Sequence, residues 1–279
     1  MKMTGIRVAR VAAAFGFAFA GMAAQADVAA GLEALDAQDF EAAITAFDAA
    51  AADGDGEGFF YLGRLIELGV TGQPDLGQAI ALYQEAVAAE PPSPQAQNRL
   101  GLLYLEGAGV IQDYEEGARL VCAAAEAGDE NALFNCALVL IDGQGVEPDA
   151  ERAIEYAMQA SELGNIGAKN LLAQSYITGE GVEPDDVKAV QFFQQTAAAG
   201  NPVGLFSLGQ AYAMGIGLDR DLIKAHAFFN LAAARNHPEA LQARQVVEAQ
   251  LERDQVTEAQ RFARAWRPTP VEGEETPEN

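Results

Sequence analysis

The chain has 279 residues, about half of them hydrophobic, and its 41 acidic and 17 basic residues give a net charge of −24 at pH 7. Nucleic acid and anionic lipid both require a basic footprint, so this balance disfavours them as partners, whereas a partner protein with a basic surface fits. Strong acidity also keeps a protein in solution, which is the simpler explanation for the same residues.

The first 26 residues are predicted to be a signal peptide that is removed after Ala26. A basic leader (Lys2, Arg7 and Arg10) precedes an apolar run from Val11 to Ala24, and Ala24-Gln25-Ala26 has the small residues of a cleavage site. An uncleaved anchor is the alternative, but a run of about 14 residues is shorter than the roughly 20 that span a bilayer. We therefore expect a periplasmic or secreted protein with no membrane insertion after cleavage, whose net charge becomes −27 because the leader holds three basic and no acidic residues.

A motif recurs every 36 residues through the middle of the chain. It reads LGLLYLEGAGV from Leu100, CALVLIDGQGV from Cys136, LAQSYITGEGV from Leu172 and LGQAYAMGIGL from Leu208. Each copy begins with an apolar residue followed by Gly or Ala and ends in Gly-x-Gly and then Val or Leu. A fixed period of this length indicates stacked structural repeats.

Each repeat is predicted to hold two short helices, helix A and helix B. In helix A the apolar residues fall at helical spacing, as in Leu100, Leu103 and Tyr104, and the Gly-x-Gly tail ends the helix. An aspartate then begins helix B, because its carboxylate can accept hydrogen bonds from free backbone N–H groups. The six aspartates in this role are Asp39, Asp75, Asp113, Asp149, Asp185 and Asp221, and a glycine fifteen residues later ends helix B in four copies, at Gly54, Gly128, Gly164 and Gly200.

The pattern A-x-x-x-L-G-x-x-Y-x-x-G-x-G-V…D…A…G, carried by Ala96, Leu100, Gly101 and Tyr104 and the tail that follows, resembles the Sel-like repeat, a relative of the tetratricopeptide repeat. The resemblance covers about residues 28–266. It implies an all-α fold: a right-handed α/α solenoid of about five to six 36-residue helix pairs with a C-terminal helical cap. The copy at Cys136 departs from the pattern, with Cys136-Ala137 in place of Leu-Gly and Leu140 in place of Tyr.

The chain is accordingly divided into five parts. They are the signal peptide at 1–26, an N-terminal partial repeat at 27–54, the Sel-like repeats at 55–236, capping helices at 237–267 and an acidic tail, predicted to be disordered, at 268–279. A first short helix is expected at 28–38 and a helix B from Asp39 to Asp53. Helix A is expected near 57–68, 95–106, 131–142, 167–178 and 203–214, and helix B near 75–89, 113–127, 149–163, 185–199 and 221–235.

The cap is predicted from the loss of the period after Pro238. Helices are expected at 239–251 and 257–266, the second beginning with a cap at Thr257. Such a pair would cover the last apolar face of a solenoid. Trp266 is expected to pack there, and a role as a binding aromatic is the alternative.

Cys122 and Cys136 are predicted to form a disulfide. They lie at equal distances from the predicted turn Gly128-Asp129-Glu130, and antiparallel helices joined at that turn bring such residues side by side. The predicted compartment is oxidising, which permits the bridge. Two buried thiols that serve as small apolar residues are the alternative.

No catalytic, cofactor or metal motif is recognisable. His226 and His237 are eleven residues apart without a Cys or carboxylate at ligand spacing, and the Gly-x-Gly tails follow helices rather than strands. We therefore expect no enzymatic activity, no cofactor and no metal. A hydrolase acting on cell-wall or β-lactam substrates is the alternative, although the sequence shows no nucleophile or metal centre for it.

A candidate partner-binding row follows from the resemblance, because helix A lines the concave side of tetratricopeptide-like folds. The residues two before, one before and two after the Leu of each Leu-Gly pair should face outward. Amides at such positions can bind an extended backbone, and Arg and Tyr are common at binding hot spots. The candidates are Tyr61, Arg64, Asn98, Arg99, Asn135, Asn170, Gln174, Ser207 and Gln210, with Phe60, Leu102, Phe134, Leu138, Leu171 and Phe206 at the same positions.

These expectations converge on a non-enzymatic adaptor in the bacterial periplasm that binds a protein or peptide on its helix-A face. The resemblance implies a partner such as a membrane sensor protein, and hence a role in regulating an envelope signalling system. A passive envelope scaffold is the remaining alternative, as is the possibility that the row residues are solvated or pack on a neighbouring helix.

Overall fold

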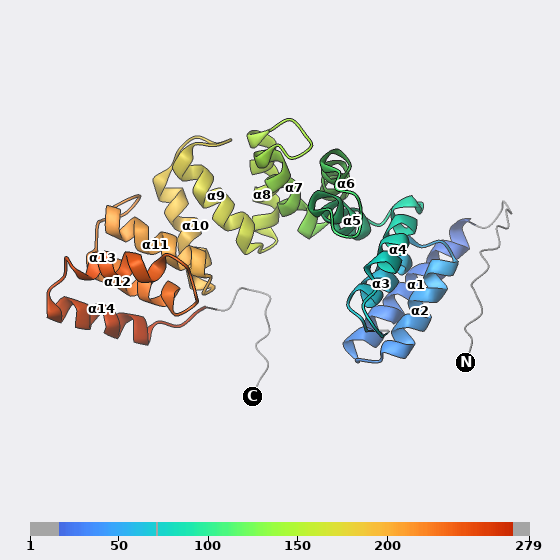
Figure 1. The fold of residues 1–279 in the computed structure, drawn as a ribbon, viewed down its shortest axis with the longest axis horizontal. Coiled ribbons are helices and arrows are strands. Elements are labelled where there is room, and N and C mark those ends of the chain that lie inside the picture. The colour runs from blue at the N-terminus through green and yellow to red at the C-terminus, as the bar shows by residue number, and fades with distance from the viewer. Residues whose placement is uncertain (1–16, 71, 270–279) are drawn as a thin grey trace. The chain divides into compact units, whose positions relative to one another are not determined.

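The computed structural model describes residues 17–70 and 72–269, which form fourteen helices and no strand (Figure 1). Two compact units divide the chain, Met1–Leu100 and Gly101–Asn279. The helices of unit 1 are α1 (Phe17–Asp36), α2 (Phe40–Ala52), α3 (Gly56–Glu67) and α4 (Leu76–Ala88), and α5 (Pro94–Glu106) extends across the boundary. Those of unit 2 are α6 (Tyr114–Glu126), α7 (Glu130–Asp142), α8 (Ala150–Glu162), α9 (Ile166–Thr178), α10 (Asp186–Ala198), α11 (Pro202–Met214), α12 (Leu222–Ala233), α13 (Ala240–Glu248) and α14 (Arg253–Ala265).

The aspartates predicted to begin helix B do so in all six copies. Each carboxylate accepts a hydrogen bond from the backbone N–H three residues later, as in the 3.0 Å bond from the Arg152 N–H to Asp149. Such a bond satisfies a donor that the first helical turn leaves free. Helix A is capped in the same way by Asp129, Asn165 and Asn201, and by Asp55, which accepts from the Glu57 N–H two residues later. The predicted helix bounds inside the repeats are therefore confirmed to within two residues.

The second glycine of the Gly-x-Gly tail brings successive repeats of unit 2 into contact. Gly145, Gly181 and Gly217 have positive φ, and a Cβ on any of them would collide with a backbone carbonyl in the first turn of the preceding helix B. The carbonyls belong to Tyr114, Ala150 and Asp186. A glycine is thus required for two reasons, the backbone conformation and the close approach.

Unit 1 is built around Phe47 of α2, which is fully buried with Val28, Ala43 and Leu65. Its first helix begins earlier than expected: α1 starts at Phe17 rather than at residue 28, and it continues through the predicted cleavage point after Ala26. Cleavage there would remove the first ten residues of α1 and remains a prediction. Residues 1–16 lie outside the described part of the chain.

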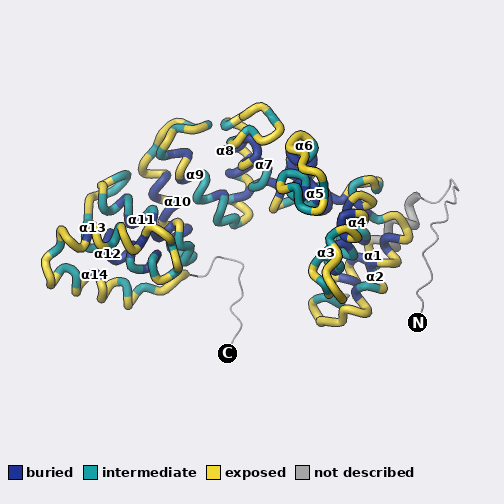
Figure 2. The backbone as a smooth tube through the Cα atoms, viewed as in Figure 1, coloured by how far each residue is buried: buried dark blue, intermediate teal, exposed yellow. Residues whose placement is uncertain are grey.

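The core of unit 2 consists of buried Ala, Leu, Val and aromatic residues from successive helices, and the tube in Figure 2 shows buried and exposed residues alternating along each helix. Small residues on helix A allow helix B to approach: a Cβ on Gly209 would lie 2.8 Å from the Phe229 ring. The Leu-Gly pair of the motif is explained by this contact.

The structure of the C-terminal cap differs from the prediction in two places. The helix predicted to start at Thr257 starts at Arg253, because the Glu252 N–H donates to the Gln255 side chain (2.9 Å), and Thr257 is an interior residue whose hydroxyl donates to the Arg253 carbonyl. Thr269, which was expected in the disordered tail, donates its N–H to the Ala198 carbonyl at 2.7 Å, and residues 270–279 of the predicted tail lie outside the described part of the chain. The packing of Trp266 is confirmed: its ring joins the core and lies 4.9 Å from the Arg235 guanidinium.

Among residues 17–70 and 72–269, no helix combines the length and the apolar character that a membrane span requires.

Candidate functional site

In unit 1 the two arginines of the predicted row form ion pairs with Glu67 of the same chain. Arg64 Nη1 lies 2.6 Å from the Glu67 carboxylate, Arg99 forms a second ion pair with it, and the Tyr83 hydroxyl donates to it at 2.5 Å. Burial alone would raise the pKa of Glu67, but the hydrogen bonds from Arg99, Tyr83 and Arg64 lower it to about 2. Burial and the same carboxylate raise the pKa of Tyr83. The two arginines of the predicted row thus bind a carboxylate of their own chain.

Two other row positions of unit 1 also face inward. Asn98 is only 8% exposed, so the expectation that it faces outward is wrong. Tyr61 is half-buried and stacks on Phe47 with 4.8 Å between ring centres. Burial raises the pKa of Tyr61, with a smaller contribution from Glu57. Packing on neighbouring helices, the alternative stated for the row, holds for these residues.

In unit 2 the predicted row is at least partly exposed to solvent. Gln174 of α9 is exposed, and Asn135 of α7, Asn170 of α9 and both Ser207 and Gln210 of α11 are half-buried. The Asn170 amide donates to Asn201, the residue that caps α11, at 3.2 Å, whereas its buried carbonyl oxygen has no hydrogen-bond partner among the described residues. Each of these three successive helices A therefore presents at least one polar side chain on the row, although the row position that is polar differs from helix to helix.

A groove of about 380 Å³ opens beside the last member of this row. It lies between α11 and α13, over α12, and the sequence did not predict it because α13 falls outside the 36-residue period. Phe206, one of the lining residues, is buried, contrary to expectation, and stacks on His237 with 4.0 Å between ring centres. The residues that line the groove are Phe206, Gln210, Ala213, Met214, Phe229, Glu239, Gln242, Ala243, Val246 and Val247.

Polar contacts between α12 and α13 fix the outer wall of the groove. His226, only 1% exposed, places Nε2 3.1 Å from the Glu248 carboxylate, and Arg244 donates to the Asn230 side chain at 2.8 Å. Burial lowers the pKa of His237, and the nearby Glu239 offsets part of that effect. Within the described ranges no three His, Cys, Asp or Glu residues gather as metal ligands would.

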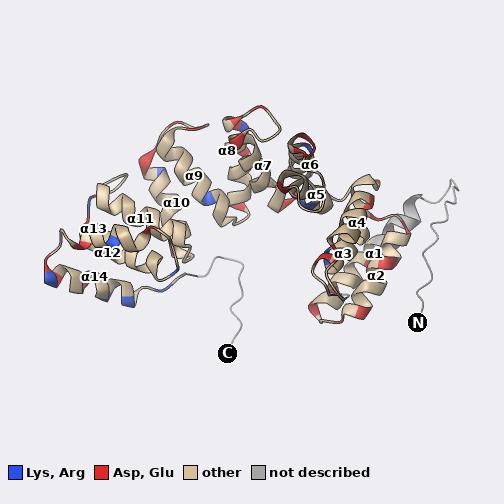
Figure 3. Ribbon diagram, in the orientation of Figure 1, with Lys and Arg blue, Asp and Glu red and all other residues tan. Residues whose placement is uncertain are grey.

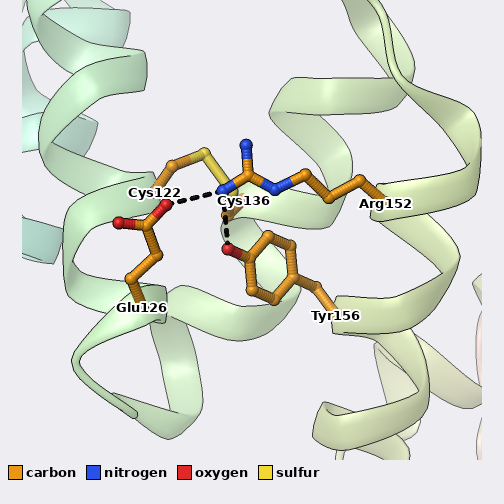
Figure 4. Close-up of a disulfide and its surroundings, with 5 residues drawn as sticks. All are labelled: Cys122, Glu126, Cys136, Arg152 and Tyr156. Atoms are coloured by element: carbon orange, nitrogen blue, oxygen red, sulfur yellow. Dashed lines mark hydrogen bonds and ion pairs between the residues drawn. A yellow bond between two sulfur atoms is a disulfide. The ribbon is translucent and has the colours of Figure 1, made fainter.

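The predicted disulfide is present and links α6 to α7. Cys122 and Cys136 are bonded, with 4.9 Å between their Cα atoms. Beside it Arg152 reaches from α8 to Glu126 on α6 at 2.6 Å and to the Tyr156 hydroxyl at 3.0 Å (Figure 4). Three consecutive helices are therefore connected at one place. A disulfide is typical of an oxidising, extracytoplasmic compartment.

Charge is distributed unevenly within the chain. Residues 27–63 contain nine acidic residues and no Lys or Arg, whereas α14 carries Arg253, Arg261 and Arg264 (Figure 3). The net negative charge is therefore concentrated in the earlier repeats, and the groove near the C-terminus carries a single charged residue, Glu239, among those that line it.

Comparison with known proteins identifies the repeat. The Sel1 repeat family model matches residues 60–90, 94–129, 131–165, 167–201 and 202–237. No curated protein matches the chain.

Several solved structures resemble the chain. One is a protective antigen of uropathogenic Escherichia coli with an SLR fold: 26% identity, TM-score 0.73, covering 82% of this chain and 49% of that protein, so this chain spans about half its length. Another is a Sel1 repeat protein from Oxalobacter formigenes, with 23% identity and a TM-score of 0.72, covering 84% of this chain and 96% of that one. Because the five matched repeats cover more than half of its residues, the chain belongs to the Sel1 repeat family.

Proposed function

We propose that this protein is a non-enzymatic adaptor of the bacterial periplasm that binds a partner protein through the helix-A positions of α7, α9 and α11. Sel1 repeats are protein-interaction repeats. The observation that carries the proposal is that each of three successive helices A keeps a polar row residue at least partly exposed. These are Asn135 and Ser207, one residue before the first residue of the motif, and Gln174 and Gln210, two residues after it. Amide and hydroxyl side chains in such a series suit the alternating donors and acceptors of an extended backbone.

Two features of the chain support the proposed periplasmic location. The Cys122–Cys136 bridge favours an oxidising compartment, and the basic, apolar and small-residue segments of residues 1–26 favour export by a cleaved signal. An adaptor in the periplasm can contact the periplasmic domains of membrane proteins directly. We therefore propose a membrane sensor protein as the class of partner, and regulation of an envelope signalling system as the role.

The partner is proposed to present a basic surface. The chain without its first 26 residues has a net charge of −27, so association with a basic protein is accelerated at low ionic strength, and association with another acidic protein is slowed. Arg64 and Arg99 are left out of the proposed contact because both hold Glu67.

The test is capture of envelope proteins by two charge-matched variants of the full chain. Gln174→Arg with Ser207→Arg places positive charge on the proposed face, and Gln191→Arg with Gln194→Arg places the same charge on exposed positions of helix B α10. The first variant should lose at least about tenfold in capture of a basic partner. The second should capture as the wild type does, and Gln174→Arg alone keeps the test valid if the half-buried Ser207 does not accept an arginine.

Equal capture of envelope proteins by both variants would contradict the proposed binding face. Turnover of cell-wall fragments or of a β-lactam by the wild-type chain, abolished by substitution of a single carboxylate, would replace the adaptor with a hydrolase. A passive scaffold would retain its partners in both variants.

A further inference from the structure

We propose that the groove between α11 and α13 binds a segment of a partner protein in which one large apolar side chain lies next to a Lys or Arg. This inference rests on the proposed function, since it names the chemistry of the partner at one end of the same face. None of the nine predicted row residues except Gln210 lines the groove.

The groove has an apolar floor and an exposed apolar rim. Phe206, Phe229 and Val247 are buried, whereas Met214 and Val246 stand 60% and 59% exposed on opposite walls. Large apolar side chains exposed at the rim of an opening remain in water unless an occupant covers them. Methionine also adapts its shape to different apolar occupants.

The size of the groove sets the size of the occupant. Its volume of about 380 Å³ is near the lower end of the roughly 300–1,000 Å³ range of ligand sites. One or two side chains of a protein segment fill such a space. Gln210 on α11 and Gln242 on α13 line the groove on opposite sides, where their amides can donate to and accept from the backbone of that segment.

Glu239 gives the groove its charge preference. It stands at the start of α13, yet its side chain makes no capping hydrogen bond, and it is the single charged residue of the lining. None of the ion pairs within residues 17–70 and 72–269 includes its carboxylate, whose charge acts on the nearby His237. A cation beside the apolar anchor would find a carboxylate there, in a chain that is itself strongly acidic.

The probes for this inference are short fluorescein-labelled peptides, tested by fluorescence polarisation with the full chain. One has a leucine between two lysines, a second replaces the leucine with glycine, and a third replaces both lysines with aspartate. The first should bind about tenfold more tightly than the second, because the leucine is buried in the groove. It should also bind at least fivefold more tightly than the third, with a preference that shrinks as salt is added.

Matched variants locate the binding. Val246→Gln should weaken binding of the leucine peptide about fivefold, whereas Val187→Gln, at a 55% exposed valine of α10, should leave it unchanged. Glu239→Gln should abolish the preference for lysine over aspartate, and Glu258→Gln, at an exposed residue of α14, should preserve it. Equal binding of the leucine and glycine peptides, equal effects of the two valine variants, or no binding of any peptide would overturn the inference.

The two proposals fail differently. If capture from envelope extract falls with Gln174→Arg but not with Val246→Gln, the adaptor face stands and the groove is not its anchor site. If neither variant changes capture and no peptide binds, both are lost.

Discussion

Units 1 and 2 use the same helix-A positions in different ways. In unit 1, Arg64 stands two residues after the Leu of its repeat motif and pairs with Glu67, whereas at the equivalent position of unit 2 Gln174 is exposed. The difference arises from the neighbours. Three residues after Arg64 stands the Glu67 carboxylate, which also accepts from Tyr83, whereas three residues after Gln174 stands the uncharged Ile177. A position within a repeat therefore sets where a side chain lies, and the charges around it set whether that side chain is available to a partner.

The units also differ in what connects their consecutive helices. Glu67 of α3 joins Tyr83 of α4 and Arg99 of α5 by charge and hydrogen bonds, whereas Cys122 of α6 and Cys136 of α7 are joined covalently. The first connection depends on pH and the second on reductant. Each can therefore be broken without touching the other.

The largest effect is expected from removal of the Glu67 carboxylate. Glu67→Ala leaves two arginines and a tyrosine hydroxyl without their common acceptor, and we expect it to destabilise unit 1 by about 3 kcal/mol. Hydrogen exchange should show the loss of protection in α3, α4 and α5 and not in α9 to α11. The control is Glu85→Ala, at an exposed residue of α4, which should change stability by less than about 0.5 kcal/mol.

If Glu67→Ala cost no more than this control, the contacts around Glu67 would have no structural role. Arg64 and Arg99 would then return to the candidate binding row.

A slightly smaller effect, confined to unit 2, is expected from loss of the disulfide. The two cysteines are separated by 14 residues, and closure of a loop of that length stabilises a fold by at most about 3 kcal/mol. We expect about 2 kcal/mol, seen as a lower unfolding temperature in reductant and as faster exchange in α6 and α7. The variant Cys122→Ser with Cys136→Ser should show the same lower temperature and no response to reductant, and a response of unit 1 to reductant would contradict the separation.

Acid should weaken unit 1 through Glu67. The hydrogen bonds lower the pKa of Glu67 from 4.5 to about 2, so the folded state favours the charged carboxylate and its contribution is complete above pH 4.5. That contribution is lost as the pH falls toward 2, and about 2 kcal/mol should be gone by about pH 3. Unfolding by denaturant at pH 5 and about pH 3 should give a smaller difference for Glu67→Gln than for the wild type, while Glu85→Gln should behave as the wild type does.

The helices could be predicted from the sequence because the residues that begin and end them act locally and recur from repeat to repeat. Asp149 begins a helix and Gly143 ends one through contacts within a few residues, and the 36-residue period supplies several independent copies of each signal. The disulfide was predictable for a related reason, since Cys122 and Cys136 lie symmetrically about one short turn.

The sites were less predictable because they depend on contacts between different helices. Nothing near Glu67 in the sequence indicates that Tyr83 and Arg99, 16 and 32 residues later, will meet it. The groove requires α13, whose position follows from contacts with α12 such as that of the buried His226 with Glu248, rather than from a motif. In the cap, where no period guides the reading, the start of α14 was placed at Thr257 because the Glu252–Gln255 contact was not recognised.

The smallest effect sharpens the comparison between equivalent positions. Gln174→Ala should change the free energy of unfolding by less than about 0.5 kcal/mol, because the side chain is exposed, whereas Arg64→Ala should cost about 1.5 kcal/mol through its bond to Glu67. Denaturant unfolding of the two variants side by side measures this difference. Equal losses would mean that Gln174 also holds the fold together, and the face proposed to bind a partner would then be structural in both units.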